Sequence, residues 1–185
     1  MYIQPKEISE YPFYLRWFFR RQEKRLGLIL LPGLFWGRMP FLQILFVLYW
    51  GHLDRKKSKL DPTLRALVQV RVAQMNSCEF CIDYNAFNFL KRSNSLDKVD
   101  ALDDWKSNPL FTKKEKCALS YVEQITNIEI SVPEKLQEQL KSFFSDDQIV
   151  ELAALISFQN MSAKFNSALA IPSQGLCQIP KNNDA

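Results

Sequence analysis

Four segments of the chain begin with residues that start α-helices and continue for the length of a helix. Residues 60–75 open with Asp61 as a candidate N-cap and Pro62 at the first helical position. The other three, residues 111–126, 131–144 and 145–170, open with the capping-box spacing, at Thr112/Glu115, Ser131/Glu134 and Ser145/Gln148. The chain has only 5 glycines, fewer than the tight turns of a β-rich protein need. The sequence therefore predicts a single all-α domain.

Two apolar segments raise the question of what buries them. Residues 149–158 are apolar on nearly every side, which predicts a central, buried helix. Residues 26–50 are interrupted by Pro32, Arg38 and Pro40, and their longest unbroken run has 10 residues, whereas a membrane span needs about 20. We therefore expect buried helices around a proline-containing turn and no membrane partner. The basic and aromatic residues 13–25 are also compatible with binding to a membrane surface.

The net charge and the N-terminal sequence indicate which partners and which cellular compartment to expect. The formal net charge of +4, from 24 basic and 20 acidic residues, does not indicate a nucleic-acid partner, and we expect none. The first residues, MYIQPKEISEYP, show no basic segment followed by an apolar core, so we predict no signal peptide and a cytoplasmic location. In that compartment a Cys-x-x-Cys pair is more often catalytic or metal-binding than structural.

Cys78 and Cys81 form such a pair within AQMNSCEFCIDYN, residues 73–85. Ser77 is a candidate N-cap for a helix that runs to about residue 90, which would place Cys78 in the first turn. Backbone N–H groups and the helix dipole stabilise a thiolate there. Cys81, three residues on, and Asn85, four residues beyond it, share one helix face. This spacing suits thiol–disulfide exchange.

Three interpretations of the pair remain open on the residues alone. Both cysteines can be small core residues, because buried free cysteine is common. A zinc site needs four ligands, and the chain offers only one histidine, His52, with Cys117 and Cys177 isolated in the sequence. A redox dithiol needs only the two thiols, and it is the interpretation that we favour. We accordingly expect no metal and no cofactor.

The sequence around the pair resembles a known family. LDPTLRALVQVRVAQMNSCEFCIDYN is similar to the signature of the carboxymuconolactone decarboxylase superfamily, in its alkylhydroperoxidase D-like branch. FTKKEKCALSYVEQIT and SDDQIVELAALISFQNMSAKFNSAL resemble its later helices. The resemblance implies an all-helical AhpD-like core at residues 61–171, assembly into trimers or hexamers, and a dithiol that reduces peroxides. Residues 1–60 then form an N-terminal helical extension packed on the same domain, and residues 172–185 form an irregular tail with mobile last residues, 181–185.

Two positions depart from what the resemblance implies. The peroxidase branch has a glutamate twelve residues before the first cysteine and a histidine four residues after the second, which act as a proton relay. Here those positions hold Ala66 and Asn85. Asn85 can orient a thiol or a water but cannot take up a proton near neutral pH. Glu123 is our candidate for a replacement base, because the family often has a glutamate there, although a solvated helix residue explains it as well.

These observations predict a thiol-dependent peroxidase or disulfide oxidoreductase in antioxidant defence, with Cys78, Cys81, Asn85 and Glu123 as its catalytic residues. Its partners would be a hydroperoxide or disulfide substrate, a thiol reductant protein of unknown identity, and further copies of the chain. The helix dipole favours Cys78 as the attacking thiol, whereas the family's relay favours Cys81, which we assign as peroxidatic. The alternative is a redox-responsive oligomeric binding or scaffold protein with little turnover. We rank carboxymuconolactone decarboxylation itself lower, because that chemistry needs no Cys-x-x-Cys pair.

Overall fold

A computed structural model describes residues 1–129 and 131–178, and within them the chain is helical and contains no β-strand. The predicted all-α class is therefore confirmed. The α-helices of the described residues are α1 (Phe13–Leu26), α2 (Leu31–Trp36), α3 (Pro40–Leu53), α4 (Pro62–Met75), α5 (Glu79–Ser93), α6 (Asp97–Asp100), α7 (Lys113–Thr126), α8 (Glu134–Phe143) and α9 (Asp146–Ala168). Short 3-10 helices occupy Ile8–Glu10 and Leu176–Gln178. The tail prediction for residues 181–185 lies outside the described residues.

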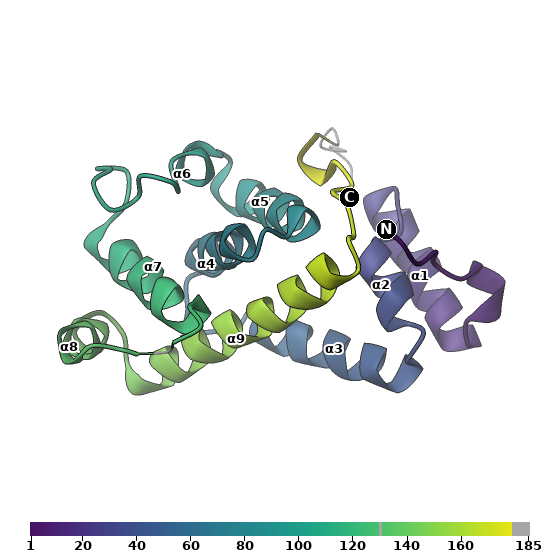
Figure 1. Cartoon of the computed structure of the whole chain (residues 1–185), viewed down its shortest axis with the longest axis horizontal. Helices are drawn as coiled ribbons and strands as arrows, with labels where there is room; N and C mark the ends of the chain where they lie inside the picture. Colours follow the sequence, from purple (N-terminus) through teal and green to yellow (C-terminus); the bar gives the residue numbers. More distant parts are fainter. Residues whose placement is uncertain (130, 179–185) are drawn as a thin grey trace.

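Helix α4 lies at the centre of the arrangement and packs against α5, α7 and α9 (Figure 1). The long helix α9 passes beneath the α4–α5 pair, with α3 on its other side, while α8 lies at one end of the molecule and α1 and α2 lie at the other (Figure 1). The residues of the expected N-terminal extension, 1–60, therefore supply α1, α2 and α3.

The sequence of α4 explains its central place. Asp61 accepts hydrogen bonds from two backbone N–H groups of the first turn, which confirms it as the N-cap. Nine of the fourteen residues of α4 are buried, and they reach three apolar clusters. Val68 packs with α7 and α9, Leu67 packs with α5, and Ala73 packs with the two cysteines. Because burial of each large apolar side chain contributes about 1.5–3 kcal/mol, α4 holds the clusters together.

Two of the three capping boxes predicted from the sequence are present in the structure. Both reciprocal hydrogen bonds form between Thr112 and Glu115 at the start of α7, and between Ser145 and Gln148 at the start of α9. Each box satisfies backbone groups within one turn, so it depends on local sequence alone.

The prediction of a third capping box, at Ser131 and Glu134, is wrong. Helix α8 begins at Glu134 with Pro133 in the N-cap position, and no side chain caps it. A proline disfavours helical geometry in the residue before it, here Val132, so the helix begins only after the proline.

Burial along α9 differs from the prediction. Leu152 and Ile156 of α9 are fully buried, but Val150 is 70% exposed, so this helix is central without being covered on every side.

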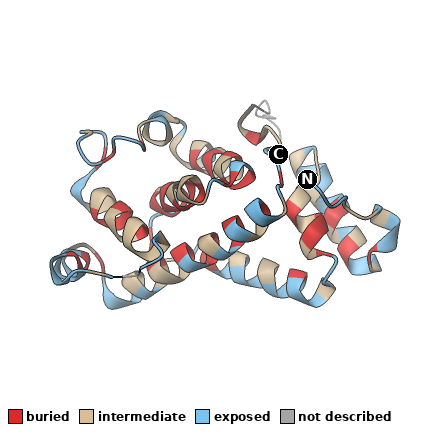
Figure 2. Ribbon diagram, viewed as in Figure 1, coloured by how far each residue is buried: buried red, intermediate tan, exposed pale blue. Residues whose placement is uncertain are grey.

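Within residues 26–50, α2 buries Pro32, Leu34 and Phe35 as expected, whereas α3 exposes much of its surface in the single chain, with Phe41 and Leu48 70% and 64% exposed (Figure 2). The sequence leaves open whether this segment is buried within one subunit or between subunits, and burial of α3 between subunits stays a prediction. Exposed apolar faces of this kind mark contact surfaces, and the expected trimer or hexamer stays a prediction.

The lengths and the apolar character of the described helices decide whether any of them could cross a membrane. None of the helices in residues 1–129 and 131–178 combines the length and the apolar character that crossing a bilayer requires.

The chain after α9 is held by one carboxylate on α5. Asp83 accepts hydrogen bonds from Ser173 Oγ and from the backbone N–H groups of Gln174, Leu176 and Cys177, at 2.9 to 3.1 Å. Burial raises the pKa of the Asp83 carboxyl, but these hydrogen bonds outweigh it and hold the pKa below its usual value. The C-terminal segment is therefore fixed behind the helix that carries the cysteines.

Gln174 extends this connection to the N-terminal helices. Its side-chain amide accepts a hydrogen bond from Leu31 N–H at 2.8 Å and donates one to the Ile29 carbonyl at 3.0 Å. The start of α2 is thus tied through the tail to α5, which positions α1 and α2 against the cysteine helix.

We predict that Asp83→Asn lowers the free energy of unfolding at pH 7 by about 2–3 kcal/mol, because hydrogen bonds to a charged group contribute about 1.5–3 kcal/mol each. The pKa of Asp83 is lower in the folded chain than in the unfolded chain. Its stabilisation is therefore complete above pH ~4 and is lost as the pH falls through the folded-state value. Urea unfolding followed from pH 7 to pH 3 should show the difference between wild type and variant shrinking.

The matched control is Asp103→Asn, since the Asp103 side chain is 94% exposed, and we expect no measurable change there. A difference between Asp83→Asn and wild type that is absent at pH 7, or that does not change with pH, would contradict the assigned role.

Candidate functional site

The site starts at the break between α4 and α5. The Asn76 side chain donates hydrogen bonds to the Val72 carbonyl and to Asn160 of α9, both at 2.8 Å, which closes the end of α4. Ser77 then takes a left-handed conformation, with φ of 50°. The prediction that Ser77 caps α5 is therefore wrong by one residue. The N-cap is Cys78, whose Sγ accepts a hydrogen bond from the Cys81 backbone N–H at 3.3 Å.

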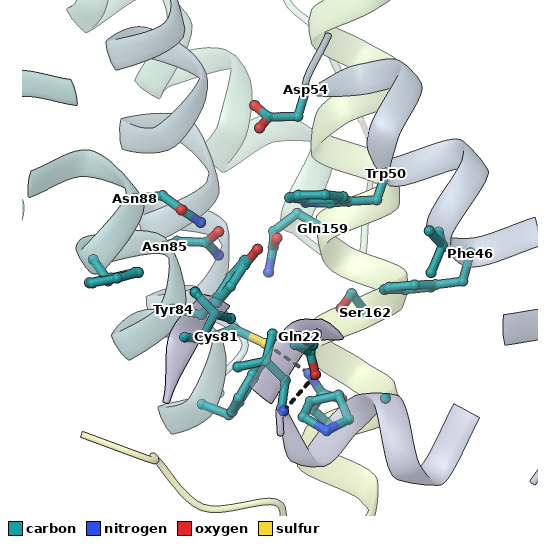
Figure 3. Close-up of a pocket in the computed structure, with 18 of the residues that line it drawn as sticks. Gln22, Phe46, Trp50, Asp54, Cys81, Tyr84, Asn85, Asn88, Gln159 and Ser162 are labelled. Atoms are coloured by element: carbon teal, nitrogen blue, oxygen red, sulfur yellow. Dashed lines mark hydrogen bonds between the residues drawn. The ribbon is translucent and has the colours of Figure 1, made fainter. Parts of the chain in front are cut away.

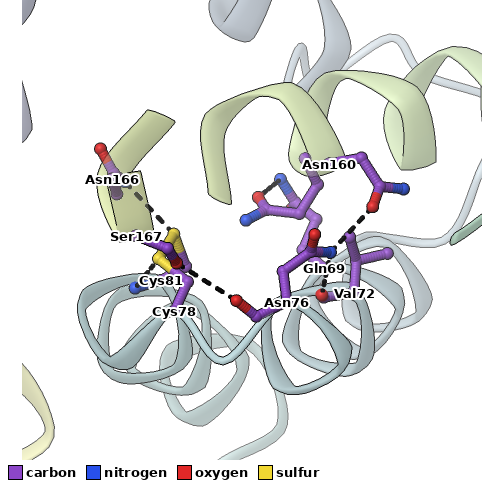
Figure 4. The surroundings of a disulfide bond; sticks show 9 residues. Gln69, Val72, Asn76, Cys78, Cys81, Asn160, Asn166 and Ser167 are labelled. Carbon is purple, nitrogen blue, oxygen red and sulfur yellow. Dashed lines mark hydrogen bonds between the residues drawn. A yellow bond between two sulfur atoms is a disulfide. The ribbon is translucent and has the colours of Figure 1, made fainter. Parts of the chain in front are cut away.

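Cys78 and Cys81 are joined by a disulfide, with their Cα atoms 5.2 Å apart (Figure 4). The expectation that this spacing brings the sulfurs together is confirmed. Both residues are almost completely buried, at 1% and 3% exposure. The two free cysteines lie elsewhere, Cys117 on the buried face of α7 and Cys177 in the tail. Within residues 1–129 and 131–178 no group of three or more His, Cys, Asp or Glu residues is arranged to hold a metal ion.

Helix α9 places an amide directly against the disulfide. Asn166 Nδ2 donates a hydrogen bond to Cys81 Sγ at 3.2 Å, and Asn166 is 1% exposed (Figure 4). Its other amide atom, Oδ1, is buried and has no partner among the described residues. In the reduced state the N–H donor stabilises a Cys81 thiolate, and the free oxygen can accept the proton of a thiol. The sequence prediction missed Asn166, although it stands in the FNSAL run that carries part of the family resemblance.

A cavity of about 450 Å³ opens onto only one of the two sulfur residues. Cys81 lines it, and Cys78 does not. In Figure 3 the side chains of Asn85 and Asn88 follow Cys81 along α5, and Gln159 and Ser162 face them from α9. The walls are aromatic and come from α1, α3, α5 and α9: Phe18, Phe46, Trp50, Phe80, Tyr84, Phe87 and Phe158. A molecule in this cavity therefore meets Cys81, with Cys78 behind it.

The structure places Asn85 in this cavity, buried, one helical turn beyond Cys81. Ala66, at the other relay position, is fully buried in the apolar cluster between α4 and α5. Neither of the two relay positions therefore holds an ionisable side chain. The neutral polar side chains that line the cavity include four amides and a serine: Asn85, Asn88, Gln159, Asn166 and Ser162.

Tyr84 and Asp54 are the ionisable groups of the cavity apart from Cys81 and the basic residues. Burial raises the pKa of the Tyr84 hydroxyl, against a hydrogen bond from Asn88 that lowers it, so Tyr84 stays protonated at neutral pH. Asp54 accepts two hydrogen bonds from Arg92, at 2.7 and 2.9 Å. Neither group is arranged as a free base.

Glu123 lies outside the cavity. Its carboxylate binds Arg71 and Lys106, each at 2.9 Å, and accepts a hydrogen bond from Trp105 Nε1 at 3.2 Å. Burial raises the pKa of the Glu123 carboxyl, but the bonds from Lys106, Arg71 and Trp105 outweigh it and lower the pKa overall. The structure brings Cys78, Cys81 and Asn85 together and separates Glu123 from them. A catalytic role for Glu123 gains no support from this placement.

Cys177 also contacts the cysteine helix, on the side away from the cavity. Its Sγ lies 3.4 Å from the Asp83 carbonyl oxygen. Burial and then the Asp83 charge raise the pKa of the Cys177 thiol to about 11. This thiol is therefore protonated at neutral pH and is a poor nucleophile.

Comparison with known sequences gives one family. The profile of the carboxymuconolactone decarboxylase family matches residues 40–124. The uncharacterized protein YnjA of Escherichia coli is 43% identical over 177 residues, which are 94% of this chain and 96% of YnjA.

Comparison with solved structures shows the same fold. The peroxidase-related protein with an alkylhydroperoxidase AhpD core from Ralstonia eutropha has a TM-score of 0.84 at 16% identity, over 94% of this chain and 93% of that one. A cysteine-to-alanine variant of the debrominase Bmp8, solved in complex with 2,3,4-tribromopyrrole, has a TM-score of 0.82 at 17% identity, over 96% and 94%. The predicted AhpD-like fold is therefore confirmed.

We predict that Asn166→Leu raises the pKa of the Cys81 thiol by about one pH unit, because a hydrogen bond to a charged group contributes about 1.5 kcal/mol. The measurement is the pH dependence of alkylation by iodoacetamide in a Cys78→Ser background, where Cys81 is the only thiol of the pair. Asn88→Leu is the control, since Asn88 lines the cavity and makes no hydrogen bond to sulfur among the described contacts. Equal pKa values in the Asn166 and Asn88 variants would contradict the role given to Asn166.

Proposed function

Because the chain belongs to the carboxymuconolactone decarboxylase family, we propose that it is a dithiol oxidoreductase that reduces organic hydroperoxides, with Cys81 as the attacking thiol and Cys78 as the resolving thiol. The observation that carries this proposal is the asymmetry of the pair. Cys81 lines the cavity and receives the Asn166 hydrogen bond, whereas Cys78 caps α5 and stands behind it. The choice between the two cysteines thus rests on access rather than on the helix dipole.

The proposed reaction has three steps that balance. The Cys81 thiolate attacks the terminal oxygen of the hydroperoxide, the O–O bond breaks, and an alcohol leaves with a proton while Cys81 becomes a sulfenic acid. The Cys78 thiol condenses with the sulfenic acid, which releases water and forms the disulfide. An external dithiol then reduces the disulfide through a mixed disulfide and restores both thiols. The oxidant is the hydroperoxide, and the reductant is a thiol compound or protein.

Proton transfer is the slow part of this scheme. A positioned acid or base typically contributes about 10²–10⁴-fold to rate, and Asn85 and Ala66 supply none. Amide hydrogen bonds from Asn85 and Asn166 hold the reacting atoms, and water must bring the proton for the leaving alcohol. We therefore propose modest turnover whose pH dependence follows the Cys81 thiol. A cytoplasmic location, as predicted from the sequence, would supply the thiol reductant.

A second candidate is a redox-responsive binding protein with little or no turnover. The lack of an ionisable relay favours it, since the dithiol could then open and close without rapid peroxide chemistry. The midpoint potential separates the two candidates. A value far below the cytosolic glutathione poise of roughly −220 to −320 mV, together with negligible peroxidase rate, indicates a structural or sensing disulfide.

A third candidate is reductive removal of a halogen from an aromatic ring by the same dithiol. It is supported by the aromatic walls around Cys81 and by the shared fold with a debrominase that binds a bromopyrrole. In such a reaction two thiols become the disulfide, the ring gains a proton, and the halide leaves. Bromide release from tribromopyrrole in the presence of dithiothreitol measures it directly.

We predict that cumene hydroperoxide is reduced by the wild-type protein with dithiothreitol as the electron donor, that Cys81→Ser brings steady-state turnover to background, and that Cys78→Ser lowers turnover. Cys81→Ser removes the attacking sulfur, whereas in Cys78→Ser the external dithiol must take the place of the resolving thiol. Cys177→Ser is the matched control and should keep the wild-type rate, since its thiol lies away from the cavity. Wild-type rates in both Cys78→Ser and Cys81→Ser would sink the proposal.

A further inference from the structure

The cavity carries a surplus of positive charge that the described residues, 1–129 and 131–178, do not neutralise. The side chains of its lining that are charged at neutral pH are four cations and one carboxylate: Arg21, Arg25, Lys91, Arg92 and Asp54. Arg92 and Asp54 pair with each other, at 2.7 Å. The other three cations form no ion pair with any carboxylate of the described residues. A cavity that presents unpaired cations beside apolar walls favours an anion.

Arg25 and Lys91, two of these cations, line the same cavity. Burial lowers the pKa of the Lys91 ammonium, and the neighbouring charge of Arg25 lowers it further. The Lys91 ammonium also lies 4.3 Å from the centre of the Phe87 ring, and this ring is part of the cavity wall. Two like charges held together at a cavity rim repel each other, and a bound anion between them would relieve the repulsion.

Lys91, one of these cations, lies far from the sulfur along the helix that carries Cys81. Lys91 is ten residues beyond Cys81 on α5, which corresponds to about 15 Å along the helix axis. Between them, Asn85 and Asn88 follow one another toward Lys91, while Trp50 and Phe46 lie opposite on α3 (Figure 3). Along α5, the cavity lining therefore runs from Cys81 past Asn85 and Asn88 to Lys91, with aromatic side chains of α3 opposite.

We propose, resting on the function proposed above, that the substrate is an amphipathic anion, a long-chain carboxylic acid that bears a hydroperoxide. Its carboxylate binds Arg25 and Lys91, its hydrocarbon chain lies between the aromatic walls, and its hydroperoxide meets Cys81. The reaction at Cys81 is the one written above, and the carboxylate is unchanged by it. Arg25 and Lys91 act here as binding residues and take no part in the chemistry.

The first experiment compares two hydroperoxides on the reduced wild-type protein: that of linoleic acid and that of its methyl ester. We expect kcat/KM for the acid to exceed that for the ester about tenfold, because the ester cannot form ion pairs with Arg25 and Lys91. The double variant Arg25→Gln/Lys91→Gln should reduce this ratio to near one. The control variant Lys56→Gln/Lys57→Gln removes two exposed charges that do not line the cavity, and it should keep the ratio.

The second experiment separates a failure of this inference from a failure of the proposed function. Binding of dodecanoate and of methyl dodecanoate is measured by calorimetry at low and at high salt, and it needs no turnover. We expect about tenfold tighter binding of the carboxylate at low salt, lost at high salt and in Arg25→Gln/Lys91→Gln. Equal binding of acid and ester, or equal loss in the cavity and control variants, would overturn the inference even if cumene hydroperoxide is reduced. Tight carboxylate binding without any peroxidase rate would instead overturn the proposed function alone.

Discussion

The break between α4 and α5 is the constraint on which the site depends. Asn76 ends α4 through bonds to its own helix and to α9, and Ser77 turns the chain in a left-handed conformation. Cys78 is then the N-cap of α5, and its sulfur accepts a hydrogen bond from the first turn of that helix. Cys81 lies in this first turn and contacts α9 through Asn166. The two sulfurs are therefore inequivalent because of backbone geometry, before any substrate is considered. Asp83, two residues further on, locks the same helix to the tail.

The chemistry follows from what surrounds the accessible sulfur. The family's relay positions hold a methyl group in the core at Ala66 and an amide at Asn85, and Asn166 adds a second amide at the sulfur itself. Amides can fix a thiolate and align a substrate, but they cannot move a proton. In such a site, the residues that bind the substrate do not transfer protons. The site therefore suits a substrate that the rest of the cavity holds firmly. In our account, the unpaired cations of the cavity bind the substrate.

Sequence alone predicted the features that depend on neighbouring residues. The cap at Asp61 and the meeting of Cys78 with Cys81 follow from one or two turns of helix, and both are confirmed. The contact between Asn166 and Cys81 spans 85 positions, so no local pattern could indicate it. The exposed face of α3 has a related cause, since apolar composition indicates burial but does not say whether the helix is buried within one chain or between chains. Glu123 was chosen by resemblance, and its partners on other elements place it away from the dithiol.

The most direct test of the account is to identify which sulfur first takes oxygen from a hydroperoxide. Reduced Cys78→Ser and Cys81→Ser proteins are each mixed with one equivalent of cumene hydroperoxide in the presence of dimedone, and the adduct is located by mass spectrometry. The account predicts rapid labelling of Cys81 in the Cys78→Ser protein and slow or absent labelling of Cys78 in the Cys81→Ser protein. Equal labelling, or faster labelling of Cys78, would contradict it.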